Sequence, residues 1–219
     1  MPFKKKALFV VIEGMEAVGK STAAKYLKEY LTELSWLETI LTREPGGTPL
    51  AEEIRIIFKS PFTKSASSLT QSFLIAAARN DHLENLIIPT LEVDKNVICD
   101  RFILSTLVYQ EHYDFLVDLN SKLVPDLTIV LTAELETIVN RMTNRSKDWR
   151  DLMVNEWHTD KQNRMLEIVK NDTDYKISKN YLVVPTDSYN TVDALHIAIS
   201  TTWNLDTYYK GLNHTTIYK

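Results

Sequence analysis

The chain carries Gly14-Met-Glu-Ala-Val-Gly19-Lys20-Ser21-Thr22 directly after an apolar run at residues 8–12. A segment with helical spacing, residues 23–31, follows it. The two glycines let the backbone curl so that successive N–H groups point inward, and the start of a helix adds partial positive charge. A strand, this loop and a helix in that order predict a phosphate-binding loop, with an ordinary glycine-containing turn as the alternative.

The side chains of this loop predict ATP and Mg²⁺ as ligands. Lys20 is expected to reach the β and γ phosphates, and the Ser21 hydroxyl is expected to ligate Mg²⁺. The whole motif is predicted to contact ATP: Gly14, Met15, Glu16, Ala17, Val18, Gly19, Lys20, Ser21 and Thr22.

Composition narrows the class of protein. The 219 residues, 44% of them apolar, fit a single domain over 1–219, with a short lid at about 143–151 and a C-terminal extension at about 206–219. A net charge of −4 argues against nonspecific nucleic-acid binding. One cysteine, Cys99, and only six apolar residues after the basic start favour a cytoplasmic protein that does not associate with membranes.

Short apolar runs alternate with helical segments, which predicts a three-layer α/β/α fold of the P-loop NTPase type with a five-stranded parallel sheet. The predicted strands are residues 7–12, 39–42, 96–99, 127–131 and 180–184. The predicted helices are residues 21–34, 48–58, 69–88, 104–112, 135–145, 152–170 and 191–203. In such sheets ligands bind beyond the carboxyl ends of the strands.

Arginines follow two of these strands. Arg43-Glu-Pro-Gly-Gly-Thr48 comes after the second strand, and Thr48 is placed to cap the next helix. Arg55, two turns along that helix, either points back to the same edge or is solvated. Asp100 and Arg101 follow the third strand, where a carboxylate suits Mg²⁺ and a guanidinium suits a phosphate; a surface salt bridge is the alternative.

A further arginine, Arg79, interrupts an apolar helical segment at 73–79. A buried arginine needs an acceptor. A nucleobase oxygen would serve, and so would a neighbouring carboxylate such as Asp81 or Glu84.

Together these motifs resemble the thymidylate kinase family, which phosphorylates dTMP to dTDP with ATP for dTTP synthesis. The resemblance runs from about residue 7 to 170, and its most specific element is the Arg-Glu-Pro-Gly-Gly-Thr loop. The matching segments are 12–22, 42–48 with 51–55, 76–79, 98–102 with 105–106 and 109–110, and 125–128.

The resemblance implies a role for each matching residue. Arg43 and Arg101, and less directly Arg55, would hold the dTMP phosphate, with Glu44 supporting the loop. Arg79 would bind a thymine carbonyl, while Tyr109 would lie under the deoxyribose and exclude a 2′-hydroxyl. The implied acceptor site is Glu16, Arg43, Glu44, Arg55, Ile75, Arg79, Arg101, Ser105, Thr106, Tyr109 and Gln110.

The resemblance also implies catalytic and metal-binding groups. Mg²⁺ would be held by Ser21, Asp100 and Glu16. Because the phosphate loop has no arginine, the lid of a bacterial-type enzyme would supply that charge from Arg145 or Arg150. The implied catalytic set is Lys20, Arg43, Asp100, Arg101, Arg145 and Arg150.

Three positions depart from the family pattern. Ala17 replaces a usual glycine and is expected to keep a negative φ. Ile75 stands where an aromatic ring usually stacks on thymine, and Thr132 stands where an aspartate is common. The segment 206–219 matches nothing in the family.

The departures leave the acceptor open. dUMP or a modified deoxyuridylate is the main rival to dTMP, and a deoxynucleoside kinase or an inactive nucleotide-binding protein is the next alternative. A homodimer is implied, with residues 73–78 and 104–108 as its interface unless they belong to the core.

Overall fold

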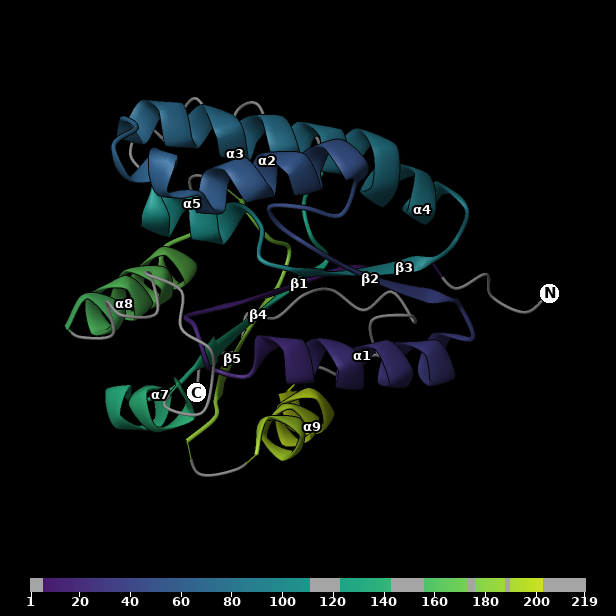
Figure 1. The fold of residues 1–219 in the computed structure, drawn as a ribbon. Helices are drawn as coiled ribbons and strands as arrows, with labels where there is room; N and C mark the ends of the chain where they lie inside the picture. Colours follow the sequence, from purple (N-terminus) through teal and green to yellow (C-terminus); the bar gives the residue numbers. More distant parts are fainter. Residues whose placement is uncertain (1–5, 111–122, 143–155, 173–175, 188–189, 203–219) are drawn as a thin grey trace.

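The computed structural model describes residues 6–110, 123–142, 156–172, 176–187 and 190–202. Its centre is a five-stranded sheet in the order β2-β3-β1-β4-β5, in which every neighbouring pair is parallel (Figure 1). The strands are β1 Phe9–Gly14, β2 Thr39–Arg43, β3 Asn96–Asp100, β4 Leu127–Thr132 and β5 Tyr181–Pro185. All five predicted strands are confirmed, with ends that shift by at most two residues.

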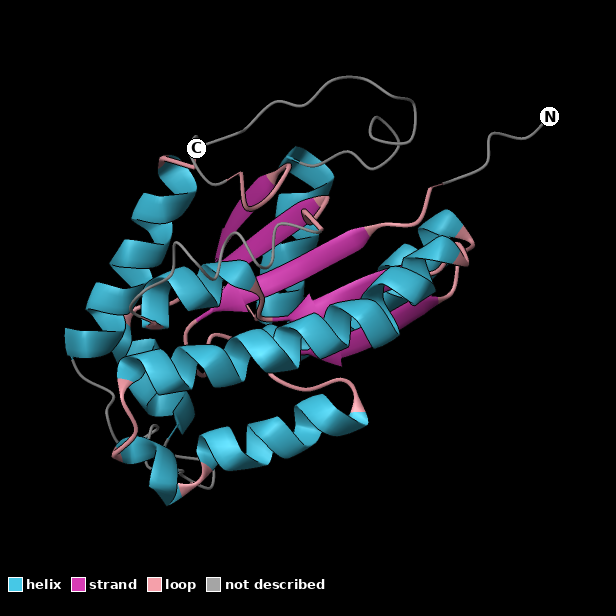
Figure 2. Ribbon diagram, turned by 90° about the horizontal axis from the view of Figure 1, so that it is seen from above, coloured by secondary structure: helices cyan, strands magenta, loops and turns pink. Residues whose placement is uncertain are grey.

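Helices cover both faces of the sheet (Figures 1 and 2). They are α1 Lys20–Ser35, α2 Pro49–Lys59, α3 Ser68–His82, α4 Ile88–Glu92, α5 Ile103–Tyr109, α7 Leu135–Met142, α8 Glu156–Lys170 and α9 Thr191–Thr202. A 3₁₀ turn at Pro61–Lys64 joins α2 to α3. The helix predicted over 104–112 is too long, because α5 ends at Tyr109 and the backbone of Gln110 is extended. The ends of the helices predicted past residues 142 and 202 and before 156 lie outside the described residues.

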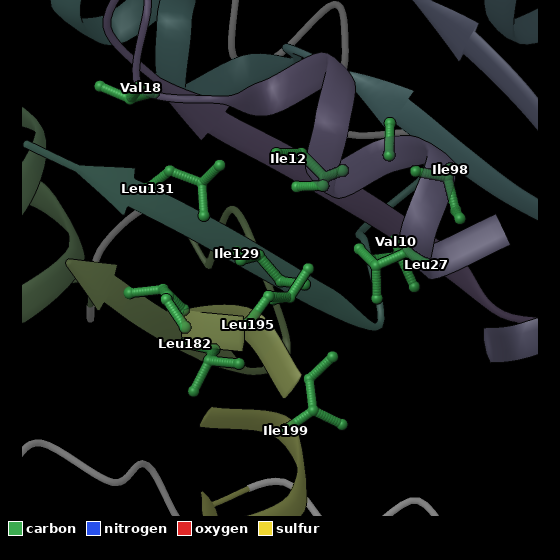
Figure 3. Close-up of a cluster of buried hydrophobic side chains, with 14 of the residues drawn as sticks. Val10, Ile12, Val18, Leu27, Ile98, Ile129, Leu131, Leu182, Leu195 and Ile199 are labelled. Carbon is green, nitrogen blue, oxygen red and sulfur yellow. The ribbon is translucent and has the colours of Figure 1, made fainter. Parts of the chain in front are cut away.

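The two faces of β1 belong to two separate cores. Val10 and Ile12 point toward α1 and α9, where they pack with Leu27 and Leu195 (Figure 3). Phe9 points to the opposite face, into a cluster with residues of α5 and α8. Because strand side chains alternate between faces, a continuous apolar strand is covered on both sides, which confirms the predicted three-layer fold.

The helix predicted over 69–88 is confirmed as continuous helical backbone, but it is not α-helical throughout. After α3 the backbone forms one π-helical turn at Leu83–Ile87, and α4 then begins with Pro89 in its first turn. Proline has no N–H and its ring clashes with the carbonyl four residues earlier. The wider turn before Pro89 accommodates both effects.

The strand register brings the carboxyl ends of three strands to one edge. Arg43 lies opposite Asp100, Asp100 lies opposite Ile12, and Gly14 lies opposite Leu131. The phosphate loop and both arginine-bearing loops therefore leave the sheet side by side. In the described part of the chain, every helix is too short or too polar to span a membrane.

Candidate active site

The phosphate loop connects β1 to α1 through backbone conformations that suit glycine. Gly14 has φ 142° and Gly19 has φ 100°. A Cβ at Gly14 would lie 2.5 Å from the Leu131 carbonyl oxygen, and one at Gly19 would lie 2.1 Å from the Thr191 hydroxyl oxygen. Both glycines are therefore required by close approach as well as by φ.

The expectation that Ala17 keeps a negative φ is wrong: its φ is 60°. The curl of the loop demands a left-handed residue at this point, and the Cβ makes that conformation unfavourable by about 1–2 kcal/mol. Arg141, at the end of α7, donates from Nη1 to the Ala17 carbonyl at 3.3 Å and to the Thr186 hydroxyl at 3.0 Å. The family resemblance did not single out Arg141, which links the phosphate loop to the segment after β5.

Lys20 begins α1 and folds back over the loop. Its Nζ donates to the carbonyl oxygens of Met15 at 2.7 Å and Gly14 at 3.1 Å. Burial and the nearby Arg101 cation lower the pKa of Lys20 to about 8. Ser21 follows it on the first turn of α1 and is exposed.

Arg101 is the centre of a charged cluster that joins the phosphate loop to β3. Its Nη2 donates to Glu16 Oε1 at 2.5 Å and its Nη1 to the Ser105 hydroxyl at 3.0 Å. Burial alone would raise the pKa of Glu16, but Arg101 and Lys20 hold it at about 2. Burial would lower the pKa of Arg101, yet Glu16 raises it overall. Arg101 has φ 73°, a strained conformation of the kind found at functional sites.

Glu13 fixes the segment that carries these groups, although the sequence analysis gave it no role. Its Oε1 accepts from the backbone N–H groups of Phe102 at 2.8 Å and Ser105 at 3.0 Å, and its Oε2 accepts from the Ser105 hydroxyl at 2.6 Å. Burial raises the pKa of Glu13 despite these bonds and the Arg101 charge. A carboxylate ending an apolar strand is the signal that could have identified it.

The loop after β2 is held by side chains of α2. Arg43 donates from Nη2 to Glu52 Oε2 at 2.9 Å, and its side chain is half-exposed. Arg55 donates to the Pro45 carbonyl at 2.7 Å, so it does point back to this edge of the sheet. The Thr48 hydroxyl accepts from the Ala51 N–H at 3.2 Å, which confirms the predicted cap.

Arg79 is buried against the same loop. Its Nε donates to Glu44 Oε2 at 2.5 Å, its Nη2 to the Phe102 carbonyl at 3.0 Å, and its guanidinium lies over the Phe102 ring. The carboxylate partner is thus Glu44, not Asp81, which accepts from the Thr48 hydroxyl, and not Glu84. Glu44 is distant in sequence but adjacent in space because its loop lies against α3.

Four buried side-chain atoms on this side have no hydrogen-bond partner among the described residues. They are Arg79 Nη1, Asp100 Oδ1, Thr106 Oγ1 and Gln110 Oε1. Buried polar groups in folded proteins are almost always satisfied, and a bound ligand is one common explanation when they are not. All four belong to residues that the sequence analysis assigned to the acceptor or the metal.

The remaining predicted residues surround this group or fall outside it. The Tyr109 hydroxyl donates to Met15 Sδ at 3.0 Å, its ring lies beneath the Arg101 guanidinium, and burial raises its pKa to about 12. Ile75 is buried in α3. Arg145 and Arg150, with the rest of the predicted lid, lie outside the described residues.

Comparison with known proteins identifies the family of this chain. The family model described as thymidylate kinase matches residues 12–184. A thymidylate kinase of Symbiobacterium thermophilum is 40% identical over 161 residues, which cover 69% of this chain and 75% of that protein. One from Caldicellulosiruptor saccharolyticus is 39% identical over 152 residues, covering 65% and 73%.

Solved structures lead to the same family. The crystal structure of thymidylate kinase from Ehrlichia chaffeensis superposes with a TM-score of 0.68 at 26% identity, covering 91% of this chain and 100% of that one. The family model spans more than half of the chain, and the relatives exceed one third identity. This chain belongs to the thymidylate kinase family.

Proposed function

We propose that the chain transfers the γ-phosphoryl group of ATP to dTMP, giving dTDP. The observation that carries the proposal is the set of four buried side-chain atoms without a partner among the described residues, which includes both donors and acceptors. Thymine offers two carbonyl acceptors and one N–H donor to such groups. Arg79 Nη1 would donate to a thymine carbonyl, and Thr106 and Gln110 would face the rest of the base.

The acceptor phosphate would be bound by cations from two loops. Arg43 ends β2 and Arg101 follows the neighbouring strand β3, and Arg55 supports the first loop through the Pro45 carbonyl. To bind the acceptor phosphate, Arg43 would break its bond with Glu52. The phosphate would replace Glu52 as its partner because it carries more negative charge than a carboxylate. Tyr109, under Arg101, would contact the deoxyribose.

The residues present fit a Mg²⁺ ion. Asp100 has a buried oxygen with no partner in the described part of the chain, and Ser21 offers a hydroxyl at the start of α1. Bound there, Mg²⁺ would neutralise charge on the β and γ phosphates. Glu16, the third predicted ligand, is already the counterion of Arg101, and we therefore assign it mainly to holding that arginine.

The reaction needs positive charge and no general base. A phosphate monoester has a second pKa of about 6, so the acceptor is mostly ionised at neutral pH. Lys20, Arg43 and Arg101 would offset the repulsion between the two nucleotides. Arg145 or Arg150 would stabilise charge on the transferred group when the lid closes.

An assay of ADP formation with ATP, Mg²⁺ and a panel of acceptors tests the proposal. The panel contains dTMP, dUMP, a 5-substituted dUMP, dCMP and thymidine. We expect dTMP to be the best acceptor. Faster turnover of dUMP or the substituted nucleotide would favour the alternative that the acceptor is dUMP or a modified deoxyuridylate. Ile75 supports this alternative, since an aliphatic contact is less selective for the base than a stacked aromatic ring. Turnover of thymidine alone would indicate a nucleoside kinase, and none at all an inactive binder.

We further propose a homodimer, formed through α2 and α3. Both helices expose large apolar side chains, among them Ile56, Ile57, Leu69 and Phe73. For residues 104–108 the structure favours the core alternative, because Leu104, Leu107 and Val108 are buried. Sedimentation should give twice the monomer mass, and Phe73→Glu should reduce it; a monomeric wild-type protein would contradict this proposal.

The chain is also proposed to act as one domain in the cytoplasm. All described strands share one sheet, and Cys99 is a free, buried thiol.

A further inference from the structure

His82 packs against the end of β2 and the loop after it, a position that no motif assigned. It is the last residue of α3, it is fully buried, and both ring nitrogens have partners. Nδ1 lies 3.3 Å from Glu44 Oε1, and Nε2 lies 2.6 Å from the Thr42 hydroxyl. Gly47 packs directly against the ring, since a Cβ there would lie 2.3 Å from Nε2.

The direction of these bonds follows from their chemistry. An ionised carboxylate only accepts, so Nδ1 carries the proton that it donates to Glu44. The Thr42 hydroxyl donates to Nε2 of the neutral ring, or accepts from it when the ring is charged. Thr42 therefore fixes the orientation of the ring without interrupting the bond from Nδ1.

Glu44 transmits this arrangement to Arg79. Its Oε1 faces His82, and its Oε2 accepts from Arg79 Nε at 2.5 Å. With Nε on Glu44 and Nη2 on the Phe102 carbonyl, the guanidinium plane is fixed, and only Nη1 remains without a partner among the described residues. That atom is the one proposed to contact the base.

We infer that His82 is a positioning residue for base recognition, acting through Glu44 on Arg79. This inference rests on the proposed function, in which Arg79 donates to a thymine carbonyl, and it takes that carbonyl to be the one at C4. Cytosine carries an amino group at the same position, which cannot accept that bond. His82 should therefore influence the affinity for dTMP and the preference for dTMP over dCMP, and should leave the ATP site unaffected.

Two substitutions at residue 82 separate positioning from simple packing. In His82→Asn the amide nitrogen can take the place of Nδ1 and donate to Glu44, whereas in His82→Gln it reaches only the place of Nε2. We expect His82→Gln to raise the dissociation constant and KM for dTMP about tenfold, the effect of losing one hydrogen bond to a charged group. We expect kcat and the KM for ATP to change by less than about twofold, because base binding is equal in the ground and transition states.

The controls make each outcome decisive. His82→Asn should recover most of the dTMP affinity, and the preference over dCMP should fall in His82→Gln alone. His196→Gln is the control variant, because it makes the same histidine-to-glutamine change on α9, outside the acceptor side. If the residue-82 variants fold poorly, Thr42→Val should still raise the dissociation constant for dTMP, with Thr42→Ser closer to wild type.

Calorimetric titration with dTMP alone gives the result independently of turnover. Equal loss of dTMP affinity in the Asn and Gln variants, or no loss in Gln, would overturn the role of His82. Failure of the wild-type chain to turn over dTMP would instead count against the proposed function, and the two failures are therefore distinguishable.

Discussion

The donor and acceptor sides of the site are built in different ways. On the donor side, the backbone of the loop between β1 and α1 makes the surface, and Lys20 bonds to the carbonyls of Gly14 and Met15 within the same loop. On the acceptor side, side chains from separate elements converge: Glu44 from the loop after β2, Arg79 from α3 and Arg101 from the end of β3. Polar atoms there remain unpartnered among the described residues.

This difference shows where the specificity of the site resides. A backbone cradle binds any phosphate of suitable charge, whereas a side-chain network with fixed donors and acceptors selects one base. Substitutions on the acceptor side should therefore affect one substrate at a time, and changes on the donor side should act through charge and backbone strain.

The largest effect on turnover should come from substitutions in the predicted lid, which belongs to neither the donor side nor the acceptor side. Replacing both Arg145 and Arg150 with alanine should reduce kcat by about 10³-fold or more while KM changes little, because an arginine that acts on the transferred group stabilises only the transition state. Steady-state kinetics provide the measurement, and Lys147→Ala is the matched control in the same segment. An unchanged kcat in the double variant would show that the two sides suffice without the lid.

Arg101→Ala should give the next largest effect. It removes a buried cation from Glu16 and from the acceptor phosphate, so kcat/KM for dTMP should fall about 10²- to 10³-fold. ATP affinity, measured by calorimetry, should change much less. Lys95→Ala, which breaks a surface pair with Glu38, is the control. Equal loss of ATP and dTMP binding would mean that the two sides are not separate.

ATP binding should depend on pH through Lys20, whose pKa in the free protein is about 8. ATP requires the ammonium form and raises that pKa, so binding above pH 8 should take up close to one proton. Affinity should fall up to about tenfold per pH unit there. Calorimetry in buffers of different ionisation enthalpy measures the uptake. Lys20→Arg should abolish it, and uptake that stays constant between pH 6.5 and 9 would contradict the assignment.

The smallest effect concerns strain in the donor loop. Ala17→Gly should stabilise the protein by about 1 kcal/mol in urea unfolding, because glycine adopts positive φ without the Cβ penalty. Ala24→Gly, in the regular part of α1, should destabilise by a similar amount. A loss of stability in Ala17→Gly would mean that the loop is not strained at this residue.

The sequence was sufficient for the backbone-built side and for the sheet. Apolar runs gave all five strands, and the glycine spacing identified the donor loop, because these features depend on neighbours in the chain. The positive φ of Ala17 was missed, since alanine itself gives no sign of the curl imposed by the loop. The π-helical turn before Pro89 was missed, since apolar periodicity predicts a helix but does not distinguish a π turn from an α turn.

The acceptor network was only partly predictable. Arg101 was identified from its position after a strand and Arg79 from its place in an apolar helical segment. The partner of Arg79 was not identified, because Glu44 lies 35 residues away in sequence. The roles of Glu13 and His82 arise from contacts 89 and 38 residues distant. Only the fold brings such groups together.

The most direct test of this account is a crystal structure with dTMP and a non-hydrolysable ATP analogue bound together. We predict that the guanidinium groups of Arg43 and Arg101 contact the acceptor phosphate and that Arg79 Nη1 lies within hydrogen-bond distance of a thymine carbonyl. Guanidinium groups directed away from the acceptor, with Arg43 still on Glu52 and Nη1 still without a partner, would contradict it.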